Sequence, residues 1–172
     1  REKSFFGTGC VAHVSVADPV SPALVDEVWR AMQAEDIAGN RGGSYLAMEG
    51  PQFSTRAESH LYRSWGCAVI GMTNMPEAKL AREAELCYAS LAMVTDYDCW
   101  HPDHDAVTVD AVIRVLLSNA DHARALVRSL AAAVTSDAHG PACVCRSALD
   151  HALITAPDAR DPAMVQKLRP IA

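Results

Sequence analysis

The chain has 172 residues, of which 50% are hydrophobic and 21% charged, an ordinary composition for a globular protein of about one domain. Its net charge is −6, with basic residues scattered along the chain, which argues against nucleic acid or an acidic membrane as a partner. No segment reads as a signal peptide, and no apolar run approaches the roughly 20 residues of a membrane span. We expect a cytoplasmic protein whose anion sites are built locally and suit phosphate.

The first third of the chain predicts short strands and helices in alternation. A short strand over 11–16 precedes a helix that Ser21 caps and that runs to about Ala34, with apolar residues at helical spacing. Residues 44–48 predict a second short strand, and residues 56–65 predict a polar helix.

The middle of the chain indicates the fold class. Two unbroken apolar runs, 67–72 and 87–94, flank a helix over 76–84 that a proline opens. Such runs are typical of parallel strands covered on both faces, so they predict a right-handed βαβ unit and an α/β fold. A long helix over 107–134 and a final helix over 142–153 complete the prediction.

Ligands of open α/β sheets bind beyond the carboxyl ends of the strands, which here are the loops 72–74 and 95–98. Asp96 and Asp98 could bind one purine together, with one carboxyl group protonating a ring nitrogen and the other accepting a hydrogen bond from an exocyclic amine. An Asx turn leading into a solvated helix approach is the alternative. Thr73 precedes a helix N-terminus and suits an anion, unless Thr73 or Asn74 only caps that helix.

Two further groups raise metal or redox hypotheses. The first is a run of metal-ligand residue types at His101, Asp103, His104 and Asp105. These residues equally form a polar entry to the long helix, and a metal site of this kind needs a distant ligand. Cys143 and Cys145 are too close for a usual zinc knuckle, so they read as a redox-sensitive pair or as two helix cysteines with one facing the core. We expect no metal.

Three segments resemble the trimeric purine nucleoside phosphorylase family. They read EGPQFSTRAE at 49–58, GMTNMPE at 71–77 and TDYDCW at 95–100, and the similarity runs from about Ser4 to about Leu130. The aspartate pair of the third segment is similar to the methylthioadenosine phosphorylase branch, whereas family members that act on 6-oxopurines carry asparagine at the position of Asp96. The resemblance implies three layers, with a central mixed, mostly parallel twisted sheet flanked by helices.

The same resemblance implies an activity and an assembly. The reaction would be phosphorolysis of S-methyl-5′-thioadenosine to adenine and 5-methylthioribose 1-phosphate by a homotrimer, with phosphate as co-substrate and no cofactor. Family members begin further upstream, so residues 1–172 are expected to be the C-terminal portion of a single phosphorylase domain that acts with its N-terminal portion. A purine nucleoside or 5′-methylthioinosine phosphorylase and a non-catalytic nucleoside-binding fragment remain the alternatives.

By resemblance, site roles fall on ten positions. Asp96 would be the catalytic acid at purine N7, and Asp98 would accept from the 6-amino group. Phe53 would pack against the base, Met72 would border the ribose, Thr95 would contact the substrate and Thr73 would bind phosphate. Ser54 and Val109 would set the preference for base and 5′-substituent, and Val112 would line the alkylthio pocket. His13 would contribute to the 5′ pocket of the neighbouring subunit. Asp96 would have to carry a proton, which burial beside Asp98 would favour.

Overall fold

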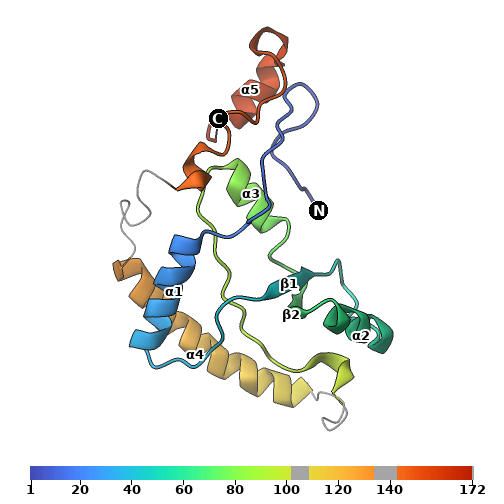
Figure 1. Cartoon of the computed structure of the whole chain (residues 1–172), viewed down its shortest axis with the longest axis vertical. Helices are drawn as coiled ribbons and strands as arrows, with labels where there is room; N and C mark the ends of the chain where they lie inside the picture. Colours follow the sequence, from blue (N-terminus) through green and yellow to red (C-terminus); the bar gives the residue numbers. More distant parts are fainter. Residues whose placement is uncertain (102–108, 134–142, 172) are drawn as a thin grey trace. The chain divides into compact units, whose positions relative to one another are not determined.

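The computed structural model describes residues 1–101, 109–133 and 143–171. The chain divides into two compact units, which we describe separately. Unit 1 comprises Arg1–Asp26, Met75–Ser90 and Thr135–Ala172, and unit 2 comprises Glu27–Asn74 and Leu91–Val134. Figure 1 traces the chain and labels its elements.

Unit 2 contains a small parallel sheet. Strand β1 (Ser44–Ala47) pairs with β2 (Cys67–Gly71), and helix α2 (Arg56–Ser64) connects them (Figure 1). A helical crossover is the usual connection between neighbouring parallel strands. The predicted strand, helix and strand are confirmed, each ending one residue earlier than expected. The α/β class is therefore correct.

A capping box fixes the start of α2. The Thr55 hydroxyl accepts from the backbone N–H of Glu58 at 3.2 Å, and the Glu58 carboxylate accepts from the N–H of Thr55 at 2.7 Å. These hydrogen bonds lower the pKa of Glu58. The helix packs against β2 and against η1 (Asp98–Trp100), where the Arg63 guanidinium lies 3.5 Å from the Trp100 ring centroid. This packing positions the 95–100 loop beside α2.

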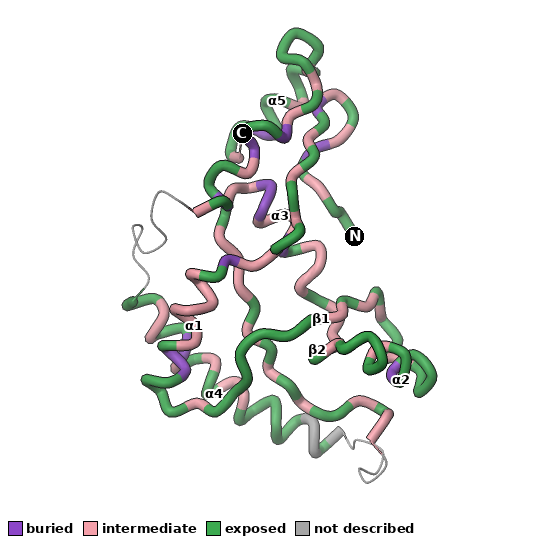
Figure 2. The backbone as a smooth tube through the Cα atoms, in the orientation of Figure 1, coloured by how far each residue is buried: buried purple, intermediate pink, exposed green. Residues whose placement is uncertain are grey.

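The core of unit 2 involves two predicted helices, α1 (Pro22–Ala34) and α4 (Val109–Ala133). Ala31, Met32 and Leu126 form its buried cluster, and Leu126 is only 1% exposed. Figure 2 shows the buried residues of α1 in purple. Both helices are confirmed; the ends of the expected long helix at 107, 108 and 134 lie outside the described residues.

Unit 1 is built from short elements. These are α3 (Glu77–Glu83), η2 (Val144–Ser147), η3 (Pro157–Ala159) and α5 (Pro162–Leu168). Its core contains Phe6, Cys10, Leu149, Ala152 and Leu168. Helix α3 confirms the prediction over 76–84.

The structure corrects two predicted strands. Residues 11–16 make one isolated antiparallel bridge, between Ala12 and Leu153, and no strand. Residues 87–94 also form no strand, so the predicted βαβ unit around α3 is wrong and the parallel pair lies one element earlier. A strand exists through hydrogen bonds to a partner, and an apolar run does not say which partner the chain supplies.

The predicted final helix over 142–153 is also wrong. Its described part contains the short 3-10 helix η2 and a turn, and Cys143 provides no side-chain cap. The last α-helix, α5, begins instead where the Asp161 carboxylate accepts from the N–H of Ala163 at 2.7 Å, with Pro162 in the first turn. That Asp-Pro start was a signal that the sequence analysis missed.

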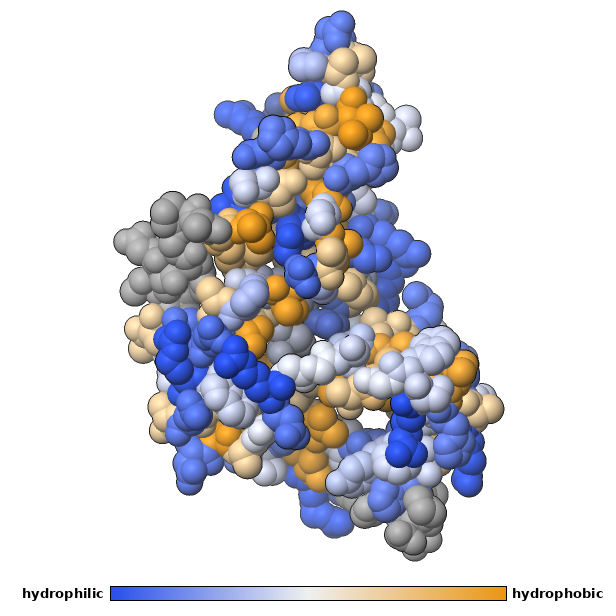
Figure 3. Space-filling view, viewed as in Figure 1, coloured by the Kyte–Doolittle hydropathy of each residue, from blue (hydrophilic) through white to orange (hydrophobic). Residues whose placement is uncertain are grey.

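Within the part of the chain described here, no helix is both long and apolar enough to cross a membrane. On the face shown in Figure 3, hydrophobic residues are interspersed with hydrophilic ones.

Candidate functional site

All predicted site positions except His13 belong to unit 2. They come from the loop before α2, the end of β2, the segment that leads into η1, and the first turn of α4. The first two segments follow β1 and β2, as expected for ligands at the carboxyl ends of strands. The segment that leads into η1 follows no strand, because residues 87–94 form none, and it lies beside α2 through the packing of η1.

The Asp98 carboxylate accepts hydrogen bonds from several surrounding groups. The Ser54 hydroxyl donates to Asp98 Oδ2 at 2.8 Å. Burial acts to raise the pKa of Asp98, but hydrogen bonds from Ser59, Ser54 and Cys99 outweigh burial and leave the pKa lowered. Because Ser59 is 2% exposed, α2 supplies one of these donors from a fixed position. The network therefore holds Asp98 as a carboxylate.

Asp96 has a different environment. Its side chain is exposed, Oδ2 accepts from the Thr95 hydroxyl at 2.6 Å, and Oδ1 accepts from the backbone N–H of Asp98 at 2.8 Å. The last bond spans two residues and makes the Asx turn that was the alternative interpretation. The burial expected beside Asp98 is not found, so the role of Asp96 as an acid stays a prediction.

Met72 and Thr73 form the second part of the candidate site, directly after β2. The Thr73 hydroxyl lies 3.3 Å from the hydroxyl of Tyr45 on β1. Met72 packs against Gly50, where an added Cβ would lie 2.7 Å from the Met72 sulfur and where φ is +68°. The N-cap residue of α3 is Pro76, which makes no side-chain cap, so neither Thr73 nor Asn74 holds the N-cap position of that helix.

The remaining unit 2 positions are open or only partly described. Phe53 is 85% exposed, and its packing against a purine base stays a prediction. Val109 and Val112 lie at the start of α4, and their side chains are outside the described residues.

Three participants were missed by the sequence analysis: Ser59, Cys99 and Tyr45. Ser59 and Cys99 act on Asp98, and the Cys99 thiol donates to the Ser54 carbonyl at 3.6 Å. Ser59 directly follows Glu58 of the capping box, and Cys99 directly follows Asp98. Their closeness in sequence to the recognised motifs was the only signal that could have predicted their contacts with Asp98. For Tyr45 there was none.

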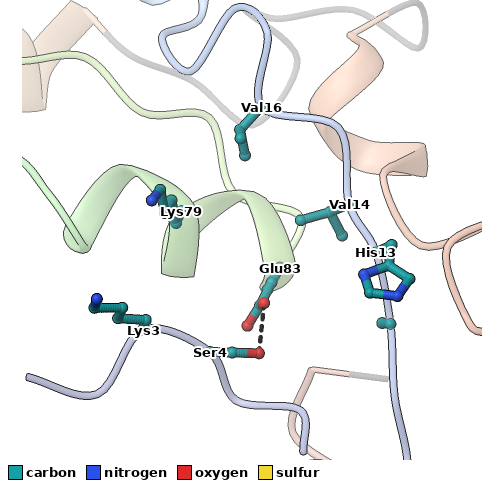
Figure 4. Close-up of a pocket in the computed structure, with 8 residues that line it drawn as sticks. Lys3, Ser4, His13, Val14, Val16, Lys79 and Glu83 are labelled. Carbon is teal, nitrogen blue, oxygen red and sulfur yellow. Dashed lines mark hydrogen bonds between the residues drawn. The ribbon is translucent and has the colours of Figure 1, made fainter.

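His13 lies in unit 1, beside a hollow of about 230 Å³. The lining residues are Lys3, Ser4, Ala12, His13, Val14, Val16, Lys79 and Glu83 (Figure 4). Glu83 accepts from the Ser4 hydroxyl and from the N–H of Phe5, both at 2.7 Å, and this ties α3 to the N-terminal segment. His13 is exposed, and its backbone N–H donates to the Ala152 carbonyl at 2.8 Å. Its contribution to a neighbouring subunit stays a prediction.

The two groups considered for metal or redox chemistry differ in outcome. In the run at 101–105, the His101 ring lies 5.1 Å from the Tyr97 ring and 5.0 Å from the Trp100 ring, measured between centroids. Asp103, His104 and Asp105 lie outside the described residues. In the cysteine pair, Cys145 is buried, as the interpretation with one core-facing cysteine predicts. The structure also places Cys87 beside Cys143.

Known proteins are similar to this chain in sequence and in fold. Residues 1–132 match the family described as the phosphorylase superfamily. The chain is 64% identical to the S-methyl-5′-thioadenosine phosphorylase of Bradyrhizobium diazoefficiens and 60% identical to that of Rhodospirillum rubrum, covering 100% of this chain in both. It spans 59% and 58% of the length of those relatives.

Solved structures agree. A methylthioadenosine phosphorylase from an antarctic soil metagenomic library superposes with a TM-score of 0.90 at 46% identity, over 100% of this chain and 60% of the other. Methylthioadenosine phosphorylase from Schistosoma mansoni in complex with adenine gives a TM-score of 0.70 at 31% identity, over 77% and 54%. The family match covers far more than half of the sequence, and on that evidence the chain belongs to the phosphorylase superfamily.

Proposed function

We propose that this chain carries the base-binding part of an enzyme that cleaves S-methyl-5′-thioadenosine by phosphorolysis. The observation that carries the proposal is the Asp98 carboxylate, which Ser54 and Ser59 hold ionised two residues from Asp96. A fixed carboxylate accepts hydrogen bonds and donates none, so it favours a 6-amino purine over a 6-oxo purine. The names of the relatives at 64% and 60% identity support the same substrate.

The proposed reaction exchanges one bond at the sugar. A phosphate oxygen bonds to C1′ while the bond from C1′ to purine N9 breaks and its electron pair goes to the base. Asp96 donates a proton at N7, so adenine leaves neutral, and the other product is 5-methylthioribose 1-phosphate. Asp98 accepts a hydrogen bond from the 6-amino group and orients the base.

The other predicted positions complete the proposal. Thr73 would contact phosphate, which is a co-substrate and not a cofactor, and Met72 would border the ribose. The base and the 5′-substituent would be contacted by Phe53, Ser54, Thr95, Val109 and Val112, with His13 reaching a neighbouring subunit of a homotrimer. The trimer, the cytoplasmic location and the assignment of the chain to one phosphorylase domain stay predictions.

Two alternative functions predict different behaviour toward the base and the substrate. A purine nucleoside or 5′-methylthioinosine phosphorylase would place a 6-oxo oxygen against Asp98, where two acceptors repel each other. A non-catalytic nucleoside-binding fragment would bind adenine and leave methylthioadenosine intact.

The deciding experiment measures adenine release from methylthioadenosine by the purified protein, with and without phosphate. We expect release only with phosphate, a slower reaction with methylthioinosine, and a fall in kcat of about 10²- to 10⁴-fold in Asp96→Asn. Asp150→Asn, at an exposed position in unit 1, is the matched control and should keep the full rate. Adenine binding without phosphate-dependent release would favour the binding fragment.

A further inference from the structure

Three cysteines of unit 1 converge, although the sequence separates them. Cys87 follows α3, and Cys143 and Cys145 lie at the start of η2. Their Sγ atoms all lie within 4.8 Å of one another, and those of Cys87 and Cys143 are 3.1 Å apart. Cys145 is 2% exposed, whereas the other two are half-buried, so the cluster has a buried floor and an accessible side.

Hydrogen bonds anchor both segments that carry the thiols. The Glu85 carboxylate, two residues before Cys87, accepts from the N–H of Leu149, two residues after η2, at 2.9 Å. On the other side of Cys87, the Tyr88 carbonyl accepts from the N–H of Ser21 at 2.7 Å. The Ser21 side chain, 2% exposed, also hydrogen-bonds Cys87 and Cys143. The sulfurs are therefore positioned by contacts on several sides.

We propose that Cys87, Cys143 and Cys145 form a three-thiolate site for one thiophilic metal ion, such as Zn²⁺ or Cu⁺. Sulfur ligands select soft and borderline ions, and the metal-to-sulfur distance for zinc is about 2.3 Å. Three sulfurs that already lie within 4.8 Å of one another can close on such an ion by small side-chain rotations. Zn²⁺ would complete its tetrahedron with a water on the accessible side.

Binding must displace protons, because the thiolate is the ligand. Burial is the main reason why the pKa of Cys145 is raised to about 12, and burial also raises the pKa of Cys87. A hydrogen bond from Cys87 lowers the pKa of Cys143. Each thiol gives its proton to solvent when the ion binds, so no redox partner is required.

A Cys87 to Cys143 disulfide is the competing use of the same thiols. In the structure the two sulfurs are 3.1 Å apart and both residues are free cysteines. A disulfide would use two sulfurs and leave no role for the third. The convergence of Cys145 on the pair is what favours a metal.

The test uses the purified protein, reduced and stripped of metal, with Cd²⁺ as the spectroscopic probe and Zn²⁺ as the second ion. We expect one ion per chain by mass spectrometry under non-denaturing conditions, with the ultraviolet thiolate-to-cadmium charge-transfer band. Cys143→Ser should weaken binding at least about 100-fold, since even outer-shell changes cost up to that much. Cys67→Ser, at a cysteine of unit 2 outside both sites, should bind like the parent.

A second readout needs no substitution. Bound metal should protect Cys87 and Cys143, the two half-buried thiols of the cluster, from alkylation in the parent protein, while Cys67 and Cys99 react as before. Absence of binding by the folded, reduced protein would overturn the proposal, as would protection that falls on other cysteines. A Cys87 to Cys143 disulfide that persists in the reducing buffer and excludes metal would overturn it as well.

Discussion

The Ser54 hydroxyl donates a 2.8 Å hydrogen bond to Asp98 and so joins the loop before α2 to the start of η1. Asp98 has φ of +58°, a left-handed conformation that is uncommon for a residue other than glycine. The hydrogen bonds that Asp98 receives from Ser54, Ser59 and Cys99 accompany this conformation and set its charge. Substitutions at this network should therefore affect substrate recognition more than the fold.

Ser54→Ala removes one donor and should raise the pKa of Asp98 back toward 3.8. The parent pKa is lowered, so the stability that the ionised Asp98 contributes is present above pH 3.8 and is lost as the pH falls through the lowered value. We expect adenine affinity to fall about 5- to 10-fold, from the loss of roughly 1 kcal/mol. Calorimetric adenine titration and NMR detection of the Asp98 carboxyl would measure both effects.

Ser64→Ala is the matched control for that substitution. Ser64 also donates a hydrogen bond, at 2.7 Å, but to the Leu61 carbonyl at the end of α2. It should leave adenine affinity unchanged. Equal losses in the two variants would show that the Ser54 effect does not act through Asp98.

Asp98→Asn tests base selection. The asparagine amide can donate to a 6-oxo group, which the carboxylate cannot. We expect the kcat/KM ratio of methylthioadenosine to methylthioinosine to fall at least about tenfold, equivalent to about 1.4 kcal/mol. Steady-state rates with both substrates check this, with Asp150→Asn as the control. A ratio that stays at the parent value would mean that Asp98 does not face the 6-position.

The predictions from sequence succeeded where the signals are local. The span 44–71 was correct because a polar helix with a capping box at Thr55 and Glu58 precedes a continuous apolar run. The run over 87–94 is of the same kind and forms no strand. The difference lies in the partner strand, which belongs to tertiary structure and leaves no trace in the run itself.

The same limit applies to the sites. The aspartate motif was visible because Asp96 and Asp98 are only two positions apart, and the two hydrogen bonds of the Asp96 carboxylate are local. The Ser54 and Ser59 partners of Asp98 are distant in sequence. Cys87 and Cys143 are 56 positions apart, and Tyr45 and Thr73 are 28 apart. Nothing in residue type or spacing connects them, so only the folded chain shows these contacts.

Thr55→Ala tests the capping box of α2. The substitution removes the acceptor for the Glu58 N–H, and loss of an N-cap costs about 1 kcal/mol. The pKa of Glu58 is lowered from 4.5 by Thr55, so its stabilising contribution is present above that value and is lost as the pH falls. Urea unfolding at neutral and acidic pH should show a parent stability that drops on acidification more than that of the variant. Thr8→Ala, at an exposed turn of unit 1, should behave like the parent at both pH values.

Leu126→Ala and Leu117→Ala compare two positions of one helix. Leu126 is 1% exposed and packs with Ala31 and Met32, whereas Leu117 is 65% exposed. Truncation of the buried leucine should cost about 2–5 kcal/mol, because it removes apolar contacts and leaves a cavity. The exposed leucine should cost no more than about 0.5 kcal/mol. Both variants lose the same atoms and gain the same helix propensity, so urea unfolding isolates the burial of Leu126, and equal losses would mean that α4 is not held through this cluster.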